Sequence, residues 1–177
     1  KLRRFVGLKL GEPFSAGALQ RSIEALTRIY KDAGYAYANI GTKARQDRDK
    51  RTVALDFVLE RGPRVTVERI IVRGNYKTRD KVIRRELKIH EGELYSMSKV
   101  QASKMRVQAT GFFEQQDGVR ITEQPGTAPD RIVLLIEVKE RSTGSVNANF
   151  GFSSAENFLA MASVTQDNFL GHGTRMA

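Results

Sequence analysis

The sequence predicts an α+β protein made of a repeated β/α module and a β-rich tail. Two segments begin alike, Gly11-Glu12-Pro13-Phe14-Ser15 and Gly92-Glu93-Leu94-Tyr95-Ser96, and each opens an amphipathic helix. Two strand-like runs follow each helix. After Arg141 charged residues become sparse, and an alternating segment rich in Gly and Asn begins. A repeated module that leads into a β tail favours a scaffold that handles polypeptide over an enzyme.

Composition limits the classes that remain. A chain of 177 residues has room for two small cores. It contains no Cys, which excludes disulfides and thiolate chemistry. No apolar run reaches the roughly 20 residues of a membrane-spanning helix, so any membrane contact would use β-structure or the surface. The net charge of +10 is compatible with nucleic acid, anionic lipid or an acidic protein as partner.

The first module reads as a helix followed by a β-hairpin. Ser15 is a suitable N-cap, and Gly34 suits the position just after the helix. Between them, apolar residues recur at helical spacing: Leu19, Ile23, Leu26 and Tyr30. A strand then starts at Tyr35 and breaks at the polar run 46–50, and residues 52–59 alternate as a returning strand with one buried face.

The second module has the element order β-α-α-β-β. Residues 65–72 form a strand, Thr78 caps a short helix that reaches Leu87, and Ser96 caps a second helix that ends at Gly111. Strands over 112–122 and 132–138 complete it. In the first module Lys1 to Leu8 corresponds to the end of the first helix, so the sequence predicts that its opening strand is missing. The exposed edge at 53–59 is then expected to pair with another strand, from the tail or from another molecule.

The tail has the pattern of a strand between lipid and a polar lumen. Val146, Ala148, Phe150 and Phe152 alternate with polar or small residues. Residues 153–157 read as a turn, and residues 159–164 read as a weaker second strand. Two strands cannot close a barrel, so we expect this hairpin to be a fragment of a larger sheet whose apolar face supports self-association.

Several of these motifs resemble known proteins. The β-α-α-β-β order, the run Val65–Ile70 with Gly74-Asn75, and residues 82–87 resemble POTRA (polypeptide-transport-associated) domains. Residues 139–145 followed by Gln166-Asp167-Asn168-Phe169-Leu170-Gly171-His172-Gly173 resemble the junction into the β-barrel of BamA-type outer-membrane assembly factors. The resemblance implies tandem POTRA domains, each a three-stranded mixed sheet covered by two helices. The first, 1–62, is incomplete, the second, 64–140, is complete, and 141–177 supplies the first barrel strands.

The resemblance also implies a function and a location. It places the chain on the periplasmic side of the outer membrane of a Gram-negative bacterium. There it would bind unfolded outer-membrane proteins by adding their strands to a sheet edge, and it would dock accessory lipoproteins of the BAM complex. A two-partner-secretion or autotransporter-assembly translocator is an alternative within the superfamily. A basic nucleic-acid-binding tandem domain is the alternative from another class, and the nearly uncharged tail argues against it.

Three groups of residues are candidate binding sites. The peptide-binding edge comprises Phe113, Gln115, Val119, Ile121, Tyr37 and Ile40, although its polar residues could equally serve to block aggregation. The partner-docking group comprises Arg84, Arg85 and Glu86, which could equally be a solvated helix face. The barrel junction and turn motif comprises Gly144, Asn168, Phe169, Gly171 and Gly173.

Catalytic, metal and cofactor sites are not expected. His90 and His172 are the only histidines and lie far apart in the sequence, without any Cys. Zinc sites need three or four closely arranged ligands. The acid pairs Asp47 with Asp49 and Glu91 with Glu93 fall in polar turns, where nothing apolar would raise a carboxyl pKa.

Overall fold

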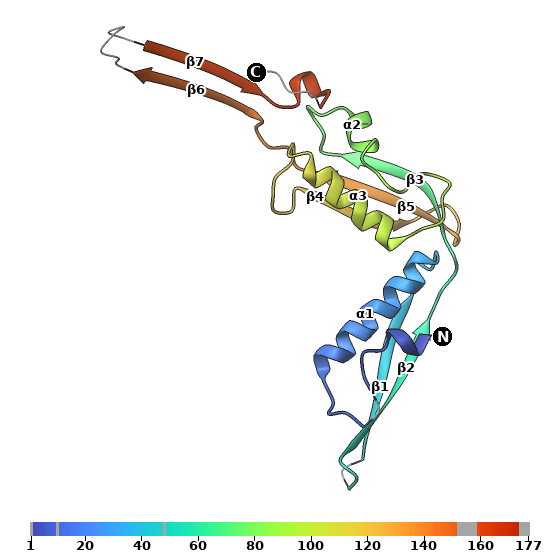
Figure 1. Cartoon of the computed structure of the whole chain (residues 1–177). Helices are drawn as coiled ribbons and strands as arrows, with labels where there is room; N and C mark the ends of the chain where they lie inside the picture. The colour runs from blue at the N-terminus through green and yellow to red at the C-terminus, as the bar shows by residue number, and fades with distance from the viewer. Residues whose placement is uncertain (1, 10, 48, 152–158, 174–177) are drawn as a thin grey trace. The chain divides into compact units, whose positions relative to one another are not determined.

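The computed structural model describes residues 2–9, 11–47, 49–151 and 159–173 (Figure 1). The chain divides into two compact units. The first unit comprises Lys1–Ile70, Ile89–Gln101 and Glu123–Val133, and the second comprises Ile71–Lys88, Ala102–Thr122 and Leu134–Ala177.

The first unit contains a helix packed on a β-hairpin. Helix α1 (Ala16–Asp32) begins at Ser15, whose hydroxyl accepts a hydrogen bond from the backbone N–H of Ala18, and Gly34 follows its end at φ 98°. The predicted cap and stop are confirmed. Strands β1 (Asn39–Asp47) and β2 (Thr52–Glu60) pair antiparallel, from Asn39 opposite Glu60 to Asp47 opposite Thr52. A short 3-10 helix, η1 (Leu2–Phe5), and β1 both pack against α1.

The hairpin forms a two-stranded sheet within the described part of the chain. No third strand lies beside β2 there, so the predicted pairing of this edge with a strand of the tail is wrong for the described residues. On β2, Leu55, Phe57 and Leu59 are half-buried and alternate with exposed residues, as predicted. Val53, which was expected on the same face, is 38% exposed. The strand predicted from Tyr35 starts later, because Tyr35 and Tyr37 lie in the connection between α1 and β1.

The second repeat contributes a three-stranded sheet and two helices. Its elements are β3 (Thr66–Arg73), α2 (Asp80–Arg84), α3 (Met97–Ala109), β4 (Val119–Pro125) and β5 (Arg131–Val138). The strand order is β3–β5–β4, so β5 is central and β4 lies at an edge. The order β-α-α-β-β is confirmed. The side chains buried in the second unit include Val82, Ile83, Leu87, Val107, Phe113, Val119, Leu134 and Ile136.

Two predicted elements are shorter than the sequence suggested. Strand β4 begins at Val119, because residues 114–118 form a turn in which Asp117 has a φ of 54° and Gly118 lies against the backbone of Glu114. Phe113 instead makes an isolated bridge with Glu140. Helix α2 ends at Arg84, and Thr78 is not its cap: Arg79 takes that position without a side-chain hydrogen bond.

The tail forms the predicted hairpin. Strands β6 (Gly144–Gly151) and β7 (Leu159–Gln166) pair antiparallel, with Val146 opposite Val164. These two valines are 74% and 64% exposed. The predicted turn at 153–157 lies outside the described residues. A final 3-10 turn, η2 (Phe169–Gly171), follows β7. No helix among the described residues is long and apolar enough to cross a membrane.

Candidate functional site

The two halves of the junction motif lie side by side at the base of the β6–β7 hairpin. Thr143 accepts a backbone hydrogen bond from Asp167 at 3.0 Å, and its hydroxyl donates to the Asp167 carbonyl at 2.6 Å. The side-chain amide of Gln166 donates to the same Thr143 hydroxyl at 3.0 Å, and Gly144 pairs with Gln166 in the strand register. Side chains more than 20 residues apart therefore close the open end of the hairpin.

Thr78 joins this base to the loop before α2. Its hydroxyl accepts a hydrogen bond of 2.8 Å from the side-chain amide of Asn168. Its backbone N–H donates to Glu140 Oε1 at 2.6 Å, and its carbonyl accepts from the Asn75 side chain at 3.0 Å. Thr78 is 2% exposed, and all three of these polar groups are satisfied. A buried polar residue that is fully hydrogen-bonded fixes one arrangement of its neighbours.

The Glu140 carboxylate holds the other side of the same loop. Its two oxygens accept backbone hydrogen bonds from Lys77 at 2.9 Å and from Thr78 at 2.6 Å. Partial burial by itself would raise the pKa of Glu140, but the hydrogen bonds from Thr78 and Lys77, together with the Lys77 charge, lower that pKa below its ordinary value. Glu140 is therefore ionised at neutral pH and holds residues 77 and 78 in place.

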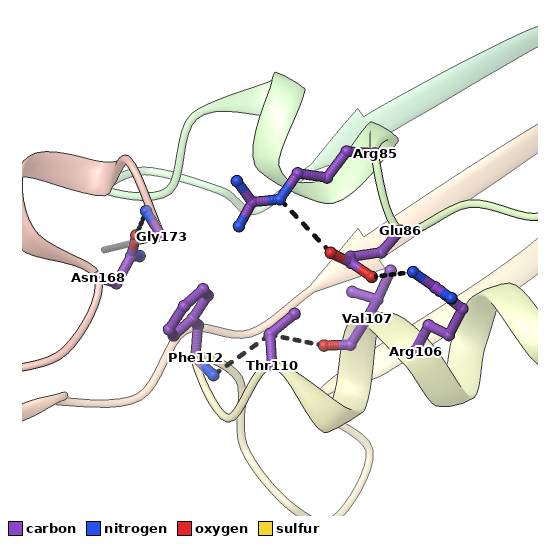
Figure 2. Close-up of polar contacts among 8 residues, drawn as sticks. All are labelled: Arg85, Glu86, Arg106, Val107, Thr110, Phe112, Asn168 and Gly173. Atoms are coloured by element: carbon purple, nitrogen blue, oxygen red, sulfur yellow. Dashed lines mark hydrogen bonds and ion pairs between the residues drawn. The ribbon is translucent and has the colours of Figure 1, made fainter. Parts of the chain in front are cut away.

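The turn after β7 depends on left-handed backbone positions. Asn168, Leu170 and Gly171 have φ values of 58°, 51° and 73°. Gly171 lies so close to the Lys77 carbonyl that any Cβ there would overlap it, and the Gly171 carbonyl accepts a hydrogen bond of 3.1 Å from Arg79 N–H. The Asn168 side chain also accepts from Gly173 N–H at 2.8 Å (Figure 2). Phe169 contributes the start of η2.

A small polar cavity of about 110 Å³ lies at this junction. Phe112, Glu140, Thr143 and Asn168 are among its lining residues. Since one water occupies about 30 Å³ of liquid, the cavity can hold a few waters and no organic cofactor.

The β4 edge presents backbone groups away from its partner strand. Lys139 N–H donates to the Gly118 carbonyl at 2.9 Å, and Gly126 N–H donates to the Arg131 carbonyl at 3.0 Å. Both bonds fit a single antiparallel register of β4 against β5. In this register the backbone N–H and C=O groups of every second β4 residue point toward β5. The backbone groups that bind β5 therefore belong to residues 118, 120, 122 and 124. The N–H and C=O groups of Val119, Ile121 and Glu123 point to the open edge.

Only three of the six predicted edge residues lie in strands. Val119 and Ile121 are in β4 and Ile40 is in β1, whereas Gln115 and Tyr37 lie in turns and Phe113 in an isolated bridge. Val119, Phe113 and Ile40 have buried side chains. Any pairing there would therefore use backbone groups and leave these side chains in the core.

The predicted docking group is partly occupied by contacts within the chain. Arg84 pairs with Asp80 at 2.5 Å, one turn earlier on α2. Glu86 lies between two guanidinium groups, Arg85 at 3.4 Å and Arg106 on α3 at 2.8 Å (Figure 2). Glu86 therefore ties the end of α2 to α3, which leaves the half-exposed Arg85 side chain as the accessible part of the group.

No group of three metal-binding side chains occurs in the part of the chain that the structure describes. His172 is half-exposed within the turn motif. The Arg79 charge, desolvation and the Lys81 charge lower its pKa below the ordinary value. His172 is therefore neutral at neutral pH and lies in a positive field.

Comparison with known proteins identifies the repeat. The family model for POTRA, described as surface antigen variable number repeat, matches residues 1–62 and 65–141. These matches cover most of the chain. The chain belongs to the POTRA family. The POTRA prediction made from residues 65–70, 74–75 and 82–87 is thus confirmed.

The relatives are outer membrane protein assembly factors. The chain is 35% identical to BamA of Neisseria meningitidis over 181 residues and 29% identical to BamA of Nitratidesulfovibrio vulgaris over 160 residues. These alignments cover 100% and 90% of the POTRA chain but only 22% and 20% of the relatives, so it spans about a fifth of their length.

Solved structures agree with this relationship. The crystal structure of Haemophilus ducreyi BamA lacking POTRA domains 1–3 matches with a TM-score of 0.81 and 31% identity, over 98% of this chain and 32% of that one. Haemophilus influenzae BamA POTRA3–5 matches with a TM-score of 0.73 and 26% identity, over 78% of this chain and 54% of that one. The predicted BamA-type resemblance, fold class and outer-membrane location are confirmed.

Thr78 and Glu140 were absent from the predicted site residues. Thr78 resembles a helix cap in sequence, and its partners Glu140 and Asn168 lie 62 and 90 residues away. The available signal was the acidic Glu140 two residues after a buried strand, next to the polar junction motif. The sequence alone does not show which backbone N–H groups this carboxylate binds, because Lys77 and Thr78 lie more than 60 residues away along the chain.

Proposed function

We propose that this POTRA chain binds unfolded outer-membrane proteins as part of an assembly factor, by pairing their strands with the open edge of β4. The observation that carries the proposal is the register of β4, which leaves the backbone groups of Val119, Ile121 and Glu123 facing outward at a sheet edge. Backbone pairing accepts many sequences, which suits a factor with many clients. Binding of this kind requires no catalytic residue or cofactor.

The tail has a separate role in this proposal. The β6–β7 hairpin supplies the first strands of the membrane barrel, and the Thr78–Glu140–Asn168 contacts hold it against the second repeat. The Val146–Val164 pair forms part of an apolar face that would contact lipid in the assembled barrel. In the isolated chain the same face supports self-association.

The proposed docking of accessory lipoproteins rests on Arg84 and Arg85. Both guanidinium groups are ion-paired, and Arg85 is the more accessible candidate because its side chain is 52% exposed, against 40% for Arg84. An exposed guanidinium at the end of a short helix is suited to orienting a contact with an acidic partner surface. The edge of β1 is a second candidate for client pairing, since β1 has no other strand beyond β2 in the described sheet.

The test of client binding uses proline substitutions in β4. Ile121→Pro removes an outward N–H and should weaken binding of a barrel-strand peptide at least tenfold while the chain stays folded, because edge strands tolerate proline on the solvent side. Ile121 is preferred to Val119, whose side chain is in the core. Arg120→Pro is the contrast, since it removes an inward N–H and should disrupt the sheet. Unchanged peptide binding by folded Ile121→Pro would refute the proposed role of the edge.

A further inference from the structure

Exposed apolar side chains and unpaired cations surround the junction. Tyr76 is 94% exposed and Leu170 is 71% exposed. They belong to two segments in direct contact through the Arg79–Gly171 and Asn168–Thr78 hydrogen bonds. Figure 1 shows η2 beside the loop that leads into α2. Five residues define what we call the interfacial patch: Tyr76, Lys77, Arg79, Lys81 and Leu170.

The cations of the interfacial patch are available to an external anion. Lys77, Arg79 and Lys81 are exposed and form no ion pair with any residue that the structure describes. The adjacent acids are already engaged, since Asp80 pairs with Arg84 and Glu140 accepts two backbone hydrogen bonds. The lowered pKa of His172 reflects the same concentration of positive charge.

Leu170 is exposed in a conformation that costs free energy. Its φ of 51° lies in the left-handed region, which is unfavourable for a side chain other than glycine or asparagine. Gly171 N–H donates to the Asn168 carbonyl at 3.0 Å, and Arg79 N–H donates to the Gly171 carbonyl at 3.1 Å, which holds the turn in this form. A strained turn that leaves a leucine in solvent indicates a partner for that leucine.

The composition of the patch fits a lipid surface. Aromatic and aliphatic side chains flanked by cations are typical of residues at the level of anionic headgroups. A lipid surface accounts for the cations and for the exposed Tyr76 and Leu170, and the position of the patch favours lipid over an acidic protein surface. Strand β7, with Val164 on its exposed apolar face, runs directly into the turn that carries Leu170.

We propose that the interfacial patch binds anionic phospholipid headgroups, with Tyr76 and Leu170 inserted among them. This inference rests on the proposed function in one respect, the entry of the β6–β7 hairpin into the membrane. It adds a lipid site on the repeat itself. The site would set the depth of the turn after β7 relative to the headgroups.

The test measures flotation of the whole chain with vesicles of phosphatidylcholine alone and of phosphatidylcholine with phosphatidylglycerol. The variant Lys77→Gln/Arg79→Gln/Lys81→Gln should lose affinity for the anionic vesicles by about fivefold for each charge removed. The variant Tyr76→Ser/Leu170→Asn should bind both vesicles more weakly. Asn is chosen at position 170 because it tolerates the left-handed conformation, so the turn is retained.

The matched control removes three exposed cations elsewhere, Lys43→Gln/Lys104→Gln/Arg120→Gln, and should retain binding. Equal loss in both triple variants would show that net charge alone drives binding and would overturn the inference. Unchanged binding by the patch triple variant would also overturn it and would favour an acidic protein as partner. Unchanged binding by Tyr76→Ser/Leu170→Asn would contradict insertion.

Failure of the lipid site can be distinguished from failure of the proposed function. Ile121→Pro should lose client peptide and keep vesicle binding, whereas the patch triple variant should keep client peptide. If only the vesicle experiment fails, the lipid site is refuted and the proposed client binding stands. If only the peptide experiment fails, the proposed client binding is refuted and the lipid site stands.

Discussion

The Asn168 side-chain amide donates a hydrogen bond of 2.8 Å to the hydroxyl of Thr78, across 90 residues of sequence. This bond connects the turn after β7 to the loop before α2. The same loop is held from the other side by Glu140. Together with the hydrogen bond from Arg79 N–H to the Gly171 carbonyl, the buried Thr78 therefore fixes the position of the turn against the second POTRA repeat.

Replacing Thr78 with Val should loosen this turn. The substitution keeps the shape of the side chain but leaves the Asn168 amide without its acceptor, at a cost of about 1 kcal/mol. Amide hydrogen exchange should accelerate at Arg79, Gly171 and Gly173, while β3 and β5 stay protected. Thr78→Ser, which keeps the hydroxyl, is the control and should exchange like the parent chain. Equal acceleration in both variants would assign the effect to packing.

The lowered pKa of Glu140 predicts a pH dependence. A carboxyl whose pKa is lower in the folded chain than in the unfolded chain adds stability above the unfolded value, about 4.3 for Glu. That contribution disappears as pH falls through the lower folded pKa. Denaturation of the parent and of Glu140→Gln at a series of pH values should therefore show a difference that is full at neutral pH and shrinks in acid. A difference that is independent of pH would contradict the assigned role of the carboxylate.

Asp32, the last residue of α1, should stabilise the start of α3. Its carboxylate accepts hydrogen bonds from the Ser96 hydroxyl at 2.8 Å and from the Ser98 N–H at 2.7 Å and hydroxyl at 2.6 Å. Asp32→Ala should lower the free energy of unfolding by about 1–2 kcal/mol, since it removes acceptors from a helix N-terminus. Urea denaturation measures this loss. Asp117→Asn, at an exposed turn position that tolerates Asn, serves as the control and should have little effect.

The sequence correctly predicted the elements whose ends are set by contacts between residues close together in the chain. Ser15, Ser96 and Gly34 mark helix ends correctly because each acts on backbone groups in the adjacent turn. The predicted start of β4 at residue 112 is wrong because residues 114–118 form a turn. Lys139 stabilises this turn by accepting a hydrogen bond from Glu114 N–H and donating one to the Gly118 carbonyl, and the strand pattern does not reveal these contacts. Thr78 was misassigned as a cap because its actual partners are distant in sequence.

The exposed apolar face of the hairpin predicts self-association of the chain. Val146 and Val164 face each other across β6 and β7 and are largely exposed. Val146→Thr/Val164→Thr keeps β-branched side chains, so the hairpin should persist while its apolar area falls. Sedimentation should show a smaller average mass than for the parent chain. An unchanged oligomeric state in this variant and in a chain truncated after Arg141 would exclude the tail as the associating element.

The most direct test of the central claim is amide hydrogen exchange by NMR at β4, with and without a barrel-strand peptide. Pairing at the open edge should slow exchange at Val119, Ile121 and Glu123, whose N–H groups face outward. The amides of Arg120 and Thr122 should change little, because they already face β5. Protection that rises at all three outward amides and not at their neighbours is the predicted result. Bound peptide with unchanged exchange at these three positions would contradict strand addition at this edge.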